Sequence, residues 1–183
     1  MKTLKTLALA AMLASGLAQA KLPDDSLYQL DSHWQNQDAG HFMLPALQGK
    51  KQVVGMIYTH CLHTCPMIVA NMQSVQKALP EGERDKVGFV LVSLTPDSDT
   101  PKVLKDFANK RGLGEDWTLL TGTESDVRAL ALALNIQYKA TMDGEVAHSN
   151  AVSVLDEQGR LLFQEVGLPQ GAKAMAERVL KGE

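Results

Sequence analysis

The chain has 183 residues, of which 45% are hydrophobic, with a formal net charge of −3 and two cysteines, Cys61 and Cys65. It contains no run of basic residues, so nucleic acid and anionic membrane surfaces are poor partners. A chain of this length is expected to fold as one domain with a proper hydrophobic core.

The first twenty residues have the pattern of a secretory signal peptide. Two lysines precede an apolar stretch at residues 7–17, and residues 18–20 read Ala-Gln-Ala, an A-x-A cleavage site. The apolar stretch is shorter than the roughly 20 residues that cross a bilayer. We therefore expect a cleaved peptide at residues 1–20 and one domain at residues 21–183, soluble in the periplasm and without a membrane anchor.

The mature chain begins irregularly and then turns strongly apolar. Residues 21–47 show little regular patterning, and we expect Tyr28, Trp34 and Phe42 to anchor them by packing. Residues 53–58 form a short continuous apolar run, which is typical of a strand buried on both faces.

A helix is predicted directly after the two cysteines. Pro66 falls in its first turn, where the missing N–H costs nothing. Cys61 and Cys65 therefore lie at a strand-to-helix junction, where free N–H groups and the helix dipole favour a thiolate over a thiol. The helix is indicated by apolar residues at helical spacing, namely Ile68, Met72, Val75 and Leu79, and it is closed by Pro80 and Gly82.

A second buried strand and helix follow. Residues 87–94 form another apolar run and lead into a polar turn. Thr100 is the expected N-cap of a helix that runs to about Lys110, with proline at its first position. We interpret Asp97 and Asp99 as turn and cap residues.

The last part of the chain predicts a strand, a helix, a β-hairpin and a closing helix. The order of elements indicates an α/β domain with a central mixed sheet flanked by helices and a β-hairpin near the C-terminus. A cysteine pair where the first strand meets a helix makes a thioredoxin-like fold the natural prediction. The segments concerned are a strand at residues 117–120, a capping box at 121–124 opening a helix to Leu134, hairpin strands at 150–155 and 161–166, and a helix at 170–181.

Cys61, Cys65 and the distant His148 are the candidate chemical groups. Residues four apart on a helix share a face within disulfide reach, so the pair can cycle between dithiol and disulfide or hold a thiophilic metal. A purely structural disulfide is disfavoured, because closing a loop of about five residues stabilises the fold by only about 2 kcal/mol. Copper(I) accepts few ligands and prefers thiolates, so Cys61, Cys65 and His148, the last expected on a loop, would make a three-ligand site suited to copper. A lone histidine on a loop is more often a surface residue, and spacing alone favours that reading of His148. The spacing differs from the C-x-x-C of dedicated dithiol oxidoreductases. This difference weakens the case for catalytic dithiol–disulfide exchange without excluding it.

Further donors lie near the cysteines. We expect His60 and His63 to be solvent-facing polar residues, and we consider His63 as a transient extra copper donor. Met56, Met67 and Met72 stand at strand or helix spacing and are expected to fill the core.

Short motifs along nearly the whole mature chain carry a resemblance to one family. They are Gly49-Lys50, the run Tyr58-Thr59-His60-Cys61, the C-x-x-x-C-P of residues 61–66, Asp99-Thr100-Pro101, Leu120-Thr121-Gly122, His148-Ser149, Leu155-Asp156 and Gly159. In this order they resemble the SCO family (SenC-type proteins), thioredoxin-fold copper-binding factors for cytochrome oxidase assembly. The resemblance implies that Cys61, Cys65 and His148 ligate copper, as Cu(I), Cu(II) or both.

Three positions depart from the family pattern. SCO proteins often carry an acidic residue where this chain has Thr95, aspartate where it has Ala147, and proline where it has Leu62. These changes leave the implied ligands intact and bear on which partner protein is recognised.

The resemblance implies a metallochaperone rather than an enzyme. Copper would pass from a site near the surface to a respiratory oxidase subunit, or be exchanged with another periplasmic copper chaperone. The alternative is a thiol–disulfide reductant, with Cys61 and Cys65 as catalytic residues, that keeps a partner protein's copper-ligand cysteines reduced. His148 separates the two, because copper binding needs it and dithiol exchange tolerates its loss. A peroxidase is a third reading, for which no residue gives a specific indication.

Overall fold

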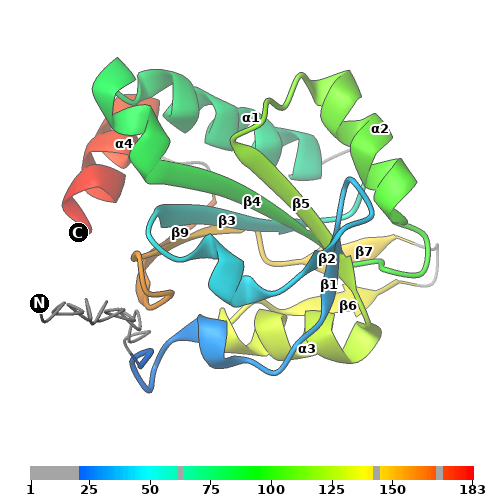
Figure 1. Ribbon diagram of the computed structural model, residues 1–183. Helices are drawn as coiled ribbons and strands as arrows, with labels where there is room; N and C mark the ends of the chain where they lie inside the picture. Colours follow the sequence, from blue (N-terminus) through cyan, green and yellow to red (C-terminus); the bar gives the residue numbers. More distant parts are fainter. Residues whose placement is uncertain (1–20, 62–63, 142–144, 168–170) are drawn as a thin grey trace, which may run out of the picture.

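The computed structural model describes residues 21–61, 64–141, 145–167 and 171–183 (Figure 1). The expected signal peptide at residues 1–20 lies outside the described residues. So do Leu62 and His63, between the two cysteines.

A seven-stranded mixed sheet forms the centre of the fold, with strand order β2-β1-β5-β4-β3-β8-β9. Strands β3, β4 and β5 are parallel, whereas β1, β2, β8 and β9 join the sheet by antiparallel pairing. The predicted α/β fold with a mixed sheet and a C-terminal hairpin, here β8 and β9, is confirmed. These strands are β1 (Trp34–Asn36), β2 (His41–Phe42), β3 (Lys51–Ile57), β4 (Val87–Ser93), β5 (Trp117–Gly122), β8 (Ala151–Leu155) and β9 (Leu161–Val166).

A second, smaller sheet was not anticipated from the sequence. Strands β6 (Tyr138–Ala140) and β7 (Val146–His148) pair only with each other in the described structure, in antiparallel register. Each is three residues long, too short for an alternating pattern to be recognised.

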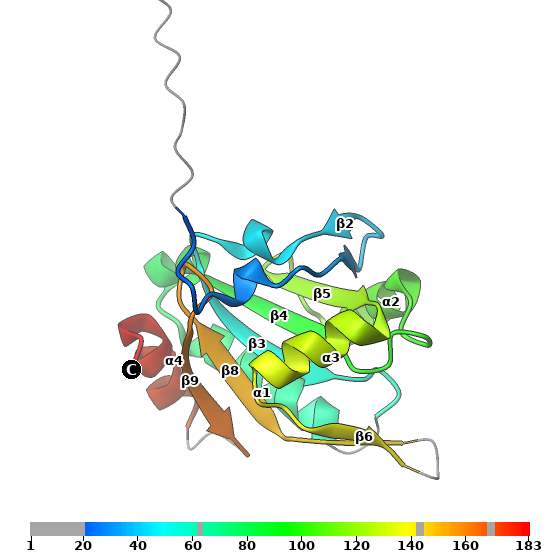
Figure 2. The ribbon, with the colours of Figure 1, turned by 90° about the horizontal axis from the view of Figure 1, so that it is seen from below.

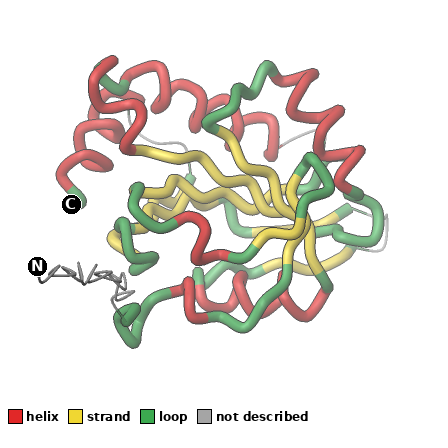
Figure 3. The backbone as a smooth tube through the Cα atoms, viewed as in Figure 1, coloured by secondary structure: helices red, strands yellow, loops and turns green. Residues whose placement is uncertain are grey.

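Helices cover both faces of the main sheet, which lies as a layer between them (Figures 1 and 3). Helices α1, α2 and α4 lie on one face, and α3 lies on the other (Figures 1 and 2). The helices are α1 (Thr64–Ala78), α2 (Pro101–Arg111), α3 (Glu124–Ala133) and α4 (Ala172–Lys181), with short 3-10 turns η1 (Leu27–Gln29), η2 (Leu44–Leu47) and η3 (Glu81–Lys86).

Each face of the sheet carries its own hydrophobic core. Ile68 and Met72 of α1 pack with Phe89 of β4 on one face. Val127 of α3 packs with Trp34 on the other. Trp34 and Tyr28 are buried, as predicted, and Phe42 packs partly buried against the same core.

The predicted N-cap is found at the start of α2 but not at the start of α3. Thr100 caps α2 and accepts a hydrogen bond from the N–H of Val103, as predicted. The capping box of α3 is formed by Thr123 and Asp126 rather than by residues 121–124. The prediction was wrong because β5 continues to Gly122, so the helix starts later.

Close packing of α1 on β3 fixes the start of α1 relative to the sheet. A Cβ atom at Gly55 would lie 3.0 Å from Met72 Sδ and 3.2 Å from Ile68 Cγ2. The absence of a side chain at Gly55 therefore allows α1 to lie directly over β3. Cys65, in the first turn of α1, is held above the end of that strand.

Within the described residues, no helix has the length and apolar character needed to cross a membrane.

Candidate metal centre

The two cysteines lie on either side of the start of α1. No disulfide joins them, and Cys61 and Cys65 are 7% and 1% exposed. The N–H of Cys65 points at Cys61 Sγ, at an N–S distance of 3.4 Å. The Cys61 N–H donates to the carbonyl of Tyr58 at 3.3 Å, so the loop turns tightly as it leaves β3. Both thiols are therefore buried more deeply than expected for the copper site near the surface that the sequence suggested.

His148 meets Cys65 although 83 residues separate them in sequence. Its Nε2 lies 3.3 Å from Cys65 Sγ, and its Nδ1 lies 3.0 Å from the carbonyl oxygen of Ser149. A carbonyl can only accept, so Nδ1 carries the hydrogen and Nε2 presents its lone pair to the sulfur. His148 stands at the end of β7 rather than on a loop, which corrects the sequence-based expectation.

Burial controls the charge of these groups. It raises the pKa of the Cys65 thiol, and the neighbouring Cys61 raises that pKa further, while backbone hydrogen bonds offset only part of the rise. The thiolate expected at the helix N-terminus is therefore not the favoured form of Cys65 in the metal-free protein, because desolvation prevails. Burial also lowers the pKa of His148, against a smaller opposing effect of its bond to Ser149. The pair is thus a thiol and a neutral imidazole, and metal binding would release the thiol proton.

Tyr58 connects the cysteine loop to the hairpin that carries His148. Its hydroxyl donates to Glu145 Oε2, and its ring meets the His148 ring edge-on at a centroid distance of 6.1 Å. Burial, followed by the hydrogen bond to Glu145, raises the pKa of Tyr58, so the hydroxyl keeps its proton. Tyr58 thereby restricts the position of His148 relative to Cys65.

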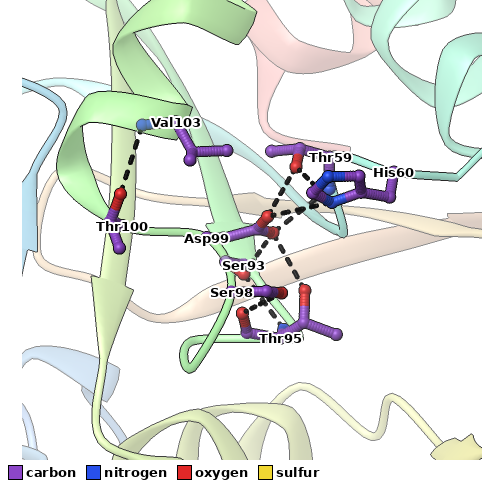
Figure 4. Close-up of polar contacts among 8 residues, drawn as sticks. All are labelled: Thr59, His60, Ser93, Thr95, Ser98, Asp99, Thr100 and Val103. Carbon is purple, nitrogen blue, oxygen red and sulfur yellow. Dashed lines mark hydrogen bonds and ion pairs between the residues drawn. The ribbon is translucent and has the colours of Figure 1, made fainter. Parts of the chain in front are cut away.

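Asp99 anchors the cysteine loop from the other side (Figure 4). Its side chain is completely buried, and Oδ2 accepts from the Thr59 N–H at 3.1 Å. The same oxygen accepts from the hydroxyls of Ser93 at 2.7 Å and Thr95 at 3.0 Å. Asp99 therefore ties the end of β3 to the loop after β4, and is more than the turn or cap residue suggested by the sequence.

Only part of the predicted ligand set is already assembled. The structure brings Cys65 to His148 and the Cys65 N–H to Cys61, yet among described residues no three His, Cys, Asp or Glu side chains form a ready metal site. Three donors of this kind, two soft sulfurs and one imidazole, suit copper best among the common metals. The complete three-ligand site of Cys61, Cys65 and His148 therefore stays a prediction.

The other candidate donors divide between core and surface. Met56 and Met72 are buried, as predicted, but Met67 is 44% exposed on the first turn of α1, so the core role was wrong for it. The His60 side chain is 74% exposed, in agreement with a solvent-facing residue.

Comparison with known proteins gives the family. The SCO1/SenC family model matches residues 27–181, which is most of the chain. The chain belongs to the SCO1/SenC family. Among relatives, the SCO1 protein homolog of Bacillus subtilis is 32% identical over 133 residues, covering 70% of this chain and 68% of that protein.

Solved structures of SCO proteins share the fold. BsSco, a member of the Sco family of cytochrome c oxidase assembly proteins in which a disulfide switch was identified, is 28% identical. It superposes with a TM-score of 0.71 over 82% of this chain and 90% of BsSco. Bradyrhizobium japonicum ScoI, solved with copper bound, has a TM-score of 0.71 at 21% identity, covering 83% of this chain and 97% of ScoI. The thioredoxin-like fold predicted from the sequence is thereby confirmed.

Proposed function

We propose that this SCO1/SenC protein binds copper through Cys61, Cys65 and His148 and delivers it to a copper site of a respiratory oxidase. The proposal places the domain of residues 21–183 in the periplasm, after cleavage of a signal peptide at residues 1–20. The recipient is an oxidase subunit, or another periplasmic copper chaperone in the same route. Family membership, the copper bound to ScoI and the oxidase-assembly role of the Sco family support it.

The observation that carries the proposal is the contact between Cys65 Sγ and His148 Nε2 at 3.3 Å. Two soft or borderline donors far apart in sequence meet beside a second thiol, with the imidazole already in the tautomer that a ligand needs. Copper(I) binds stably to such a small set of sulfur and nitrogen donors. Release follows by ligand exchange, in which donors of the recipient replace the sulfurs and the imidazole one at a time.

A copper titration of the fully reduced protein tests the proposal. Unmodified protein is compared with His148→Ala and, as matched control, His41→Ala, which removes an exposed histidine on β2 at the far edge of the sheet. We expect thiolate-to-copper(II) charge-transfer bands that saturate at one equivalent, that persist in His41→Ala and that are lost or altered in His148→Ala. Bands that are identical in all three proteins would contradict the three-ligand site.

A second function, thiol–disulfide exchange, is favoured by one observation. The two cysteines are not joined by a disulfide, and the Cys65 nitrogen already lies 3.4 Å from Cys61 Sγ, so the two residues are close enough to be oxidised together. The disulfide switch of BsSco concerns a relative with the same fold. If copper oxidises the cysteines to a disulfide in both unmodified and His148→Ala protein, and neither holds copper, the protein acts as a reductant of a partner's cysteines.

A further inference from the structure

His60 is the exposed donor immediately next to the buried copper ligands proposed above. Cys61 and Cys65 are 7% and 1% exposed, whereas the His60 side chain is 74% exposed. Consecutive Cα atoms are about 3.8 Å apart, so His60 presents its ring from the residue that adjoins Cys61 in the same loop. Direct approach of an external donor to the sulfurs is hindered, and His60 offers the open route.

The hydrogen bonds of the Thr59 hydroxyl define which nitrogen of His60 can bind a metal (Figure 4). The Thr59 hydroxyl donates to Asp99 Oδ1 at 2.5 Å, because a carboxylate oxygen accepts. With its hydrogen committed, the Thr59 oxygen can only accept from His60 Nδ1, which lies 3.2 Å away. In the neutral ring Nδ1 therefore carries the hydrogen, and Nε2 has the lone pair that can bind a metal.

Asp99, at the base of this chain of hydrogen bonds, is held by several partners. Asp99 is completely buried and is held by the Thr59 N–H and the Ser93 hydroxyl, and its Oδ1 lies 3.9 Å from His60 Nδ1. Histidines that bind metals commonly donate their second N–H to a carboxylate, carbonyl or similar partner, which fixes the tautomer and orients the ring. His148 shows the same arrangement toward the Ser149 carbonyl. The half-buried His148 and the exposed His60 thus share the same neutral tautomer.

We propose that His60 is an outer copper ligand, through which copper passes on its way to and from the buried site. The inference rests on the proposed copper-binding function. In uptake, a bond from His60 Nε2 to copper forms as a bond to an external donor breaks. The Cys61 thiol then loses its proton to solvent, and its sulfur replaces the donor that remains on copper. The copper keeps its oxidation state throughout, and the hydrogen stays on His60 Nδ1, where it is donated to the Thr59 oxygen, so the step at His60 needs neither an electron nor a proton.

Copper transfer kinetics test the role of His60. Reduced protein loaded with one equivalent of Cu(I) is mixed anaerobically with the Cu(I) chelator bathocuproine disulfonate, and the coloured complex is followed by stopped flow. The set comprises unmodified protein, His60→Ala and the matched control His41→Ala, another exposed histidine. We expect His60→Ala to release copper roughly tenfold more slowly, the effect size typical of losing a group that supports a metal site. His41→Ala should match the unmodified protein.

A second variant tests whether the orientation of the His60 ring matters in addition to its presence. Thr59→Val keeps the imidazole and the Thr59 backbone contact to Asp99 but removes the acceptor for Nδ1, so transfer should slow in the same direction. Equal rates for His60→Ala and His41→Ala would overturn the inference, as would a loss of equilibrium Cu(I) affinity in His60→Ala, which would make His60 a permanent ligand. Failure of unmodified protein to hold Cu(I) at all would instead remove the proposed function itself.

Discussion

Replacing Asp99 by asparagine tests whether a buried carboxylate positions the cysteine loop. The substitution preserves shape but replaces one oxygen by an amide nitrogen and removes the charge. Oδ2 accepts three hydrogen bonds, from Thr59, Ser93 and Thr95. Hydrogen bonds to a charged group contribute about 1.5–3 kcal/mol and neutral ones about 0.5–1.5, so weakening three of them costs about 3 kcal/mol.

Part of that loss is recovered, because the variant no longer buries a charge. We therefore expect the free energy of unfolding to fall by about 2 kcal/mol, which lowers the midpoint of thermal unfolding by roughly 4–8 °C for a domain of this size. Since the Thr59 N–H is two residues from Cys61, the loosened anchor should also reduce copper affinity by about tenfold or more.

Asp156→Asn provides the matched control. Asp156 is also a buried carboxylate, which accepts from the N–H of Gln158 and Arg160 in the β8–β9 turn. Its replacement should cost stability of the same order, roughly 1–2 kcal/mol, and leave the copper site unchanged. Thermal unfolding and competitive Cu(I) titration are measured on both variants. Full copper affinity in Asp99→Asn, or an equal loss in Asp156→Asn, would refute the positioning argument.

Two further predictions concern the histidine hairpin and acid stability. Tyr58→Phe removes the hydroxyl bound to Glu145, so His148 should be less restrained and copper(II) bands should shift or weaken, while an unchanged spectrum and affinity would contradict this role. Burial would raise the pKa of Asp156, but its hydrogen bonds with Arg160 and Gln158 outweigh burial and lower it. Its stabilising effect is therefore complete above the unfolded-state pKa of about 3.9 and is lost as pH falls through the lower folded-state value. In Asp156→Asn the free energy of unfolding, measured by urea unfolding, should therefore fall less steeply as the pH drops below about 4. Parallel curves of this free energy against pH for the two proteins would count against the prediction.

Patterns that involve many residues could be predicted from the sequence. The apolar runs of β3 and β4 and the helical spacing of α1 each repeat a single physical preference over several residues. The encounter of His148 with Cys65 followed from family resemblance rather than spacing, since contacts across such a sequence distance depend on the whole fold.

Features set by tertiary surroundings were missed. The helix N-terminus suggested an acidic Cys65, but the pKa of a buried thiol depends on desolvation, which no local pattern reports. Asp99 looked like a turn residue because its partners, Thr59 and Ser93, come from two other segments. Met67 fits the helical sequence as well as Met72 does, yet it lies on the exposed side.

The β6–β7 hairpin is a separate unit of strand pairing that side-chain contacts, such as Tyr58 with Glu145, hold against the rest of the fold. Its base is closed by the Ser149 N–H to the Gln137 carbonyl at 2.8 Å, and its far end by the Thr141 N–H to the Glu145 carbonyl at 2.8 Å. In the described structure neither of its strands belongs to the main sheet, although it carries His148. Residues 137–149 could therefore be exchanged between SCO1/SenC proteins as one unit, transplanting the imidazole donor and its flanking surface while the seven-stranded scaffold and the cysteine loop stay the same.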